Sequence, residues 1–74
     1  MNTKFESLIT CDGYIVEETN DKIRFVQEYN DCMINKKMIK RIERIGMTNE
    51  RTIHCLITLE ESFADDLQLK GILE

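Results

Sequence analysis

The strongest strand signal in this chain is the segment Thr52-Ile53-His54-Cys55-Leu56-Ile57-Thr58-Leu59. Side chains of a strand alternate between two faces, and here one face is wholly apolar. The pattern assigns this face to the core, and it consists of Ile53, Cys55, Ile57 and Leu59. The opposite face holds Leu56 among polar neighbours. We expect either the C-terminal helix, which is the simpler interpretation, or another chain to cover Leu56.

A short helix is expected directly after this strand. Ser62 is a common N-cap residue type, and Asp65 stands three positions later, as in a capping box. Phe63 and Leu67 are four residues apart and therefore share a helical face. Gly71 is the residue type that most often ends a helix. The sequence thus predicts a C-terminal helix that packs on the sheet.

Residues 13–29 predict a β-hairpin. Residues 13–18 and 22–29 are rich in β-branched and aromatic side chains, and Thr19-Asn20-Asp21 between them has turn chemistry. A second turn is expected at Asn30-Asp31. Residues 5–10 carry apolar side chains at spacings of three and four, which suits one or two helical turns but is too short to assign.

Two interpretations compete for residues 32–45. A helical face would explain the spacing of the apolar side chains, which are Ile34, Met38, Ile39, Ile42 and Ile45. In the other interpretation, residues 32–34 end a strand, Asn35-Lys36-Lys37 form a polar turn, and Ile39 to Ile45 form a strand with a bulge. The strand interpretation is favoured, because the segment has many Ile and neither Ala nor Leu. A turn at residues 46–50 follows in both cases.

The predicted fold class is therefore mainly β or α+β. It is a small antiparallel sheet or half-barrel with a short C-terminal helix, and the alternative is a ββαβα order with residues 32–45 helical. The chain has 74 residues, no Pro and no Gly/Ser-rich linker, so residues 1–74 are expected to form a single small domain.

The sequence contains no recognisable catalytic, cofactor or metal site. Its three cysteines and single histidine lack the paired short spacings of a zinc site, so none is expected. His54 and Cys55 are neighbours in a strand and point to opposite faces, which prevents them from acting together. The chain is therefore predicted not to be an enzyme. Without a signal peptide or a long apolar run, a cytoplasmic location with reduced thiols and no membrane contact is expected.

The charge is unevenly distributed. The net charge is −4, yet residues 36–51 contain six Lys and Arg against two Glu, a balance of +4 that leaves −8 elsewhere. We therefore expect an interaction protein that binds and modulates a macromolecular partner, such as a phage- or mobile-element-encoded inhibitor. A basic protein partner would contact the acidic hairpin, through Glu17, Glu18, Asp21 and Glu28.

The alternative function is nucleic-acid binding by the basic segment, through Lys36, Lys37, Lys40, Arg41 and Arg44. This alternative is less favoured, because no aromatic residue lies between Tyr29 and Phe63 to stack on bases. A small sheet also has free edges, which would allow homo-oligomers to form by strand pairing.

Overall fold

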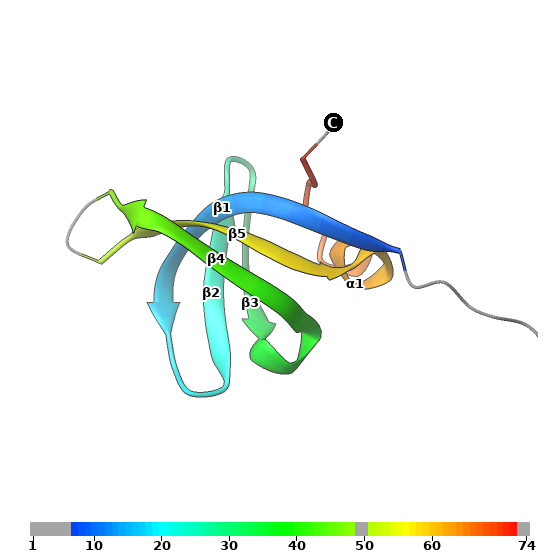
Figure 1. The fold of residues 1–74 in the computed structure, drawn as a ribbon, viewed down its shortest axis with the longest axis horizontal. Coiled ribbons are helices and arrows are strands. Elements are labelled where there is room, and N and C mark those ends of the chain that lie inside the picture. Colours follow the sequence, from blue (N-terminus) through cyan, green and yellow to red (C-terminus); the bar gives the residue numbers. More distant parts are fainter. Residues whose placement is uncertain (1–6, 49–50, 73–74) are drawn as a thin grey trace, which may run out of the picture.

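The computed structural model describes residues 7–48 and 51–72. They form a five-stranded antiparallel sheet and one short C-terminal helix (Figure 1), so the predicted mainly β class is confirmed. The strands are β1 (Leu8–Glu18), β2 (Lys22–Gln27), β3 (Asn30–Asn35), β4 (Ile39–Met47) and β5 (Ile53–Glu60). The 3-10 helix η1 (Lys36–Met38) joins β3 to β4, and α1 (Glu61–Asp66) follows β5.

The sheet is strongly curved and remains open. Its strand order is β3-β2-β1-β5-β4, so the long strand β1 lies at the centre. Residues 8–15 of β1 pair with β5 and residues 14–18 pair with β2, with a bulge at Val16 within the pairing to β2. Figure 1 shows β1 bending along its length and β4 crossing in front of β2 and β3. Because β3 and β4 are the two edge strands, η1 connects one edge of the sheet to the other.

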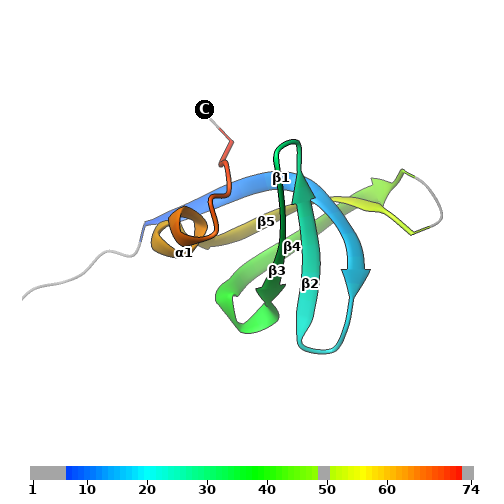
Figure 2. The same cartoon turned by 180° about the vertical axis from the view of Figure 1, so that it is seen from behind.

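The core lies on one face of this sheet, here called the core face. Its buried residues are Cys11, Ile15, Ile23, Phe25, Ile34, Cys55, Ile57, Leu59, Ala64 and Leu69. Helix α1 and the segment after it lie at one end of the sheet (Figure 2), and they contribute Ala64 and Leu69 to this core. Backbone hydrogen bonds attach both ends of the C-terminal region to the start of the sheet, from Glu61 N to Ser7 O at 2.8 Å and from Ile72 N to Thr10 O at 2.8 Å.

Residues 32–45 are not helical, so the ββαβα alternative is wrong. The favoured interpretation is confirmed, with a strand on each side of a short turn that is wound as η1. Register shifts in β4 lie between Ile39 and Arg41 and again between Arg44 and Gly46. Because each bulge adds one residue, apolar side chains three apart reach the same face, which imitates a helical spacing.

The predicted ends of the C-terminal helix are also wrong. The N-cap is Glu60, without a side-chain cap, rather than Ser62. The helix ends at Asp66, and Gln68 rather than Gly71 takes the left-handed conformation, with φ 59°. Gly71 instead lies against the side chain of Ile9. Since the helix lies on the core face, it does not cover Leu56, contrary to the simpler expectation.

Other boundaries differ from the prediction by a few residues. Strand β1 begins at Leu8 because residues 8–12 pair with β5, a long-range contact that the short apolar pattern could not show. The turn after β2 lies at Glu28-Tyr29, and Asn30-Asp31 already belong to β3. Strand β4 continues through Gly46 to Met47. Residues 5–6 and 49–50, which belong to two of the predicted segments, lie outside the described residues.

Candidate protein-binding surface

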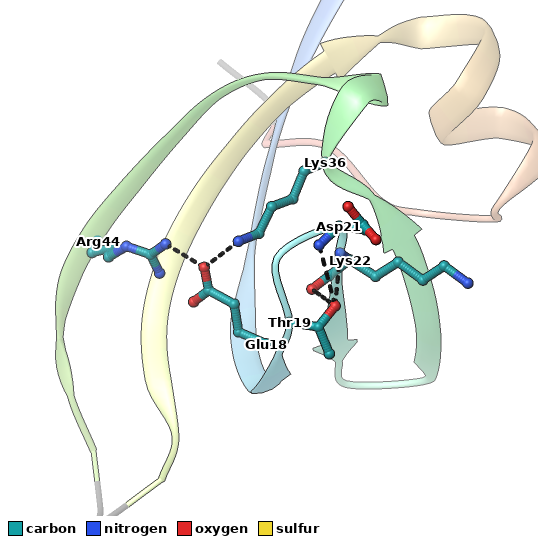
Figure 3. A network of polar contacts seen from close by, with 6 residues as sticks. All are labelled: Glu18, Thr19, Asp21, Lys22, Lys36 and Arg44. Atoms are coloured by element: carbon teal, nitrogen blue, oxygen red, sulfur yellow. Dashed lines mark hydrogen bonds and ion pairs between the residues drawn. The ribbon is translucent and has the colours of Figure 1, made fainter.

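The acidic hairpin and the basic segment meet at Glu18. Its Oε2 accepts a hydrogen bond from Lys36 Nζ at 2.7 Å and another from Arg44 Nη2 at 3.0 Å (Figure 3). The hydrogen bond from Lys36 is the main reason why the pKa of Glu18 lies below its ordinary value, and Arg44 lowers it further. One predicted acidic residue therefore forms ion pairs with two predicted basic residues, so all three side chains are engaged within the chain.

The remaining acidic residues do not gather at one place. The turn between β1 and β2 is closed by Thr19, whose hydroxyl accepts from Asp21 N at 3.3 Å and Lys22 N at 3.1 Å (Figure 3). Glu17 is exposed near this turn, 4.0 Å from Arg24 Nη1. Glu28 lies in the turn at the other end of β2. Glu17, Glu18 and Asp21 are thus grouped, whereas Glu28 is separate.

The basic residues are divided between two faces. Arg41 pairs with Thr58 in register, and Arg44 with Cys55, which places the two guanidinium groups on opposite faces of the sheet. Arg41 Nη2 lies 3.4 Å from Glu43 Oε1. Within the described part of the chain, the side chains of Lys37 and Lys40 make no ion pair. The arrangement therefore leaves isolated cations rather than a continuous basic surface.

The face opposite the core, here called the outer face, carries a cluster on its central strands. Tyr14 of β1 is the register partner of His54 of β5, and their ring centroids are 5.1 Å apart with an interplanar angle of 31°. His54 Nε2 lies 2.5 Å from Asp12 Oδ1. Leu56 lies between Asp12 on β1 and Glu43 on β4. We define the outer-face patch as Tyr14, His54 and Leu56.

A polar border surrounds this patch. Thr10 and Thr58 share a hydrogen bond of 3.1 Å between their hydroxyls. Together with Arg41, Glu43 and Leu56 they line a shallow hollow. On the side of β4, Gly46 is the register partner of His54, and a Cβ placed on Gly46 would have no atom of the described residues within 4 Å apart from its chain neighbours. The patch therefore has an apolar and aromatic centre, open space on one side, and charged groups of both signs at its border.

The sequence pointed to this patch only in part. The alternation in residues 52–59 singled out Leu56 and placed His54 on the same partly exposed face, which is confirmed because the His54 side chain is 31% exposed. Tyr14 was missed as a member of the patch, and Asp12 was missed as the contact of His54. Their proximity to His54 depends on the register between β1 and β5, and alternation within one strand carries no information about register.

The thiols lie apart from this surface. Cys11 and Cys55 are fully buried in the core, as was predicted for Cys55. Burial raises the pKa of the Cys55 thiol to about 11. It also raises the pKa values of Cys11 and Cys32. Because the thiolate is the reactive form, Cys55 behaves at neutral pH as a small apolar side chain.

A comparison of the chain with protein-family models, with curated proteins and with solved structures finds no match. Among residues 7–48 and 51–72, no helix has both the length and the apolar character needed to cross a membrane. In the same ranges, no three His, Cys, Asp or Glu side chains are placed to hold one metal ion.

Proposed function

We propose that this chain is a non-catalytic interaction protein that binds and modulates a macromolecular partner, and that another protein docks on the outer-face patch. The proposal rests on one observation. The central strands of the sheet present Tyr14, which is 39% exposed, and the half-buried Leu56 on the face that the chain's own helix leaves uncovered.

The composition of the patch resembles that of protein interfaces. Such interfaces have a centre enriched in aromatic and apolar side chains, and a polar rim. Tyr is among the residues that contribute most to binding, because it offers a large rigid contact area and a hydroxyl at its tip. Tyr14 and Leu56 would form the centre here. Asp12, Arg41 and Glu43 would form the rim, where they can select a partner by charge.

The environment of the reactive residue types supports a binding role. His54 contacts Asp12 on an open sheet face, where the Asp12 side chain is 53% exposed. Water reaches both groups there, so the His54–Asp12 contact is not shielded from solvent. The contact orients the imidazole beside the Tyr14 ring. Cys11 and Cys55 lie in the core. A partner would thus contact the oriented ring pair of Tyr14 and His54 rather than an activated nucleophile.

The test is affinity capture on the purified chain followed by titration calorimetry with the partner that is recovered. Tyr14→Ala is the test variant, and Tyr29→Ala is its matched control, because Tyr29 is 85% exposed in the turn after β2 and lies outside the patch. We expect Tyr14→Ala to weaken binding by about tenfold or more, as the loss of an anchor residue does. Tyr29→Ala should bind as the wild type does.

Equal affinities of the two variants would contradict the proposal. Two further experiments separate the other functions expected from the sequence. A loss of affinity confined to Glu17→Lys and Glu28→Lys would assign binding to the acidic hairpin. Binding of labelled DNA or RNA that weakens steeply with salt and is lost in Lys37→Ala/Lys40→Ala would assign it to the basic segment.

A further inference from the structure

The two edges of the open sheet differ in their fitness for pairing with another strand. The β4 edge is interrupted by two bulges and carries Lys40, Arg41 and Arg44. Bulges and cations are features that protect an edge from pairing. The β3 edge pairs with β2 in a continuous register and contains one charged residue, Asp31. Of the two edges, β3 therefore offers the regular backbone that an added strand requires.

The turn between β2 and β3 determines which backbone groups of β3 face outward. It has two residues, Glu28 and Tyr29, and joins the register pair of Gln27 and Asn30. In such a hairpin the closing pair is hydrogen-bonded, and bonded and non-bonded pairs alternate from there. The N–H and C=O groups of Asp31, Met33 and Asn35 thus point away from β2.

A second copy of β3 can satisfy these outward groups when it runs antiparallel about a twofold axis at Met33. In this register Met33 opposes Met33 of the second copy, and Asp31 opposes Asn35. Cys32 opposes Ile34 between these pairs. Every pair is compatible, because apolar side chains meet apolar ones and a carboxylate meets an amide. No like charges face each other, and Arg24 already holds the Asp31 carboxylate through two hydrogen bonds of 2.9 and 2.7 Å.

Charge complementarity also favours the antiparallel copy. Glu28 lies in the turn just before β3, and Lys37 lies in η1 just after it. Within the described part of the chain, neither side chain has an ion-pair partner. Antiparallel pairing brings Glu28 of one copy to the same end as Lys37 of the other, twice in each pair. A parallel copy would bring like charges together instead.

We propose that two copies of this chain associate through their β3 edges, antiparallel about a twofold axis at Met33, to form one continuous ten-stranded sheet. The contact is isologous, so it closes after two copies and builds no filament. It lies on the edge of the sheet, whereas the outer-face patch lies on a face. This inference therefore does not depend on the proposed function, and each can fail without the other.

Disulfide trapping tests the register. Residues of a hydrogen-bonded antiparallel pair have Cα atoms about 5.5 Å apart, which suits a disulfide. Met33→Cys in a Cys32→Ser background should cross-link to a product of twice 8.7 kDa under mild oxidation. Leu8→Cys in the same background is the matched control, because Leu8 is 53% exposed and Met33 is 50% exposed. We expect Met33→Cys to cross-link about tenfold faster or more. Equal rates would overturn the proposal.

Sedimentation equilibrium tests the association itself. The mean mass of the wild-type chain should rise above 8.7 kDa with concentration. Met33→Lys places two ammonium groups opposite each other and should raise the dissociation constant about tenfold or more, whereas Met33→Leu should leave it nearly unchanged. The proposal is overturned if the wild type stays monomeric up to ~1 mM. It is equally overturned if Met33→Lys associates as tightly as the wild type, a result that would move the interface to another surface.

Discussion

Gly13 occupies a position of β1 where the chain has no room for a side chain. It lies on the core face, and the ring of Phe25 from β2 covers it. A Cβ on Gly13 would stand 2.5 Å from Phe25 Cζ and 2.7 Å from the carbonyl oxygen of Val26. The second contact is with backbone in the strand that pairs with β1, so a rotamer change cannot relieve it. Gly13→Ala must therefore displace β2 as well as the Phe25 ring.

The expected cost follows from these two contacts. Overpacking of a core by one methyl group costs about 1–3 kcal/mol, and contact with backbone favours the upper end. The lower conformational entropy of Ala in the unfolded chain offsets about 0.5–1 kcal/mol of this cost. The net loss in the free energy of unfolding is about 2 kcal/mol. For a domain of this size it corresponds to a fall in Tm of about 8–16 °C.

Thermal unfolding followed by circular dichroism measures this loss, and Gly46→Ala provides the matched control. Among residues 7–48 and 51–72, no atom beyond its chain neighbours lies within 4 Å of a Cβ on Gly46, so only the entropic gain applies there. Gly46→Ala should raise Tm by about 2–8 °C. In a Phe25→Leu background, Gly13→Ala should cost about 1 kcal/mol less, because one of the two clashing groups is gone. A Tm of Gly13→Ala at or above that of the wild type would refute the packing argument.

Three further predictions concern Glu18 and the thiols. The lowered pKa of Glu18 means that its ion pairs stabilise the fold above its ordinary value of 4.5 and are lost as the pH falls below it. Glu18→Gln should therefore reduce the free energy of unfolding by less than ~1 kcal/mol at pH 7, and urea unfolding should show no difference from the wild type near pH 2. An equal difference at both pH values would argue against the ion pairs. For the thiols, the unfolded chain ionises near the ordinary value of 9, whereas native Cys55 stays protonated until about 11, so the stability should fall as the pH rises through this interval. At neutral pH a thiol reagent should label half-buried Cys32 before Cys11 or Cys55, and fast labelling that persists in Cys32→Ser would contradict the described core.

The strand predictions were most accurate where the sequence signal comes from neighbouring residues. Residues 52–59 alternate without interruption, so both the strand β5 and its core face were correctly predicted. The hairpin of β1 and β2 was predicted from turn residues flanked by β-branched and aromatic segments. Its turn, however, is closed by the Thr19 hydroxyl, and neither Asn20 nor Asp21 adopts a positive φ.

The sequence predicted less well those features that depend on a partner far away in the chain. The bulges in β4 arise where it pairs with β5, and they changed the apparent period of residues 39–45 from that of a strand to that of a helix. The start of α1 was misplaced for a similar reason. The backbone oxygen of Ser7 accepts from Glu61 N, so a group more than fifty positions away helps to define the start of a helix that Ser62 was expected to cap.

The amino-acid sequence alone determined the type of most strands and the identity of the core face of β5, because alternation and turn chemistry act between neighbouring residues. Only the tertiary structure decided which charges remain free and which surface is open. Glu18 forms ion pairs with both Lys36 and Arg44 because the curved sheet brings the end of β1 beside η1 and β4. Tyr14 meets His54 because β1 and β5 pair in one particular register. Both contacts join residues far apart in the chain, and their proximity depends on how the whole sheet folds.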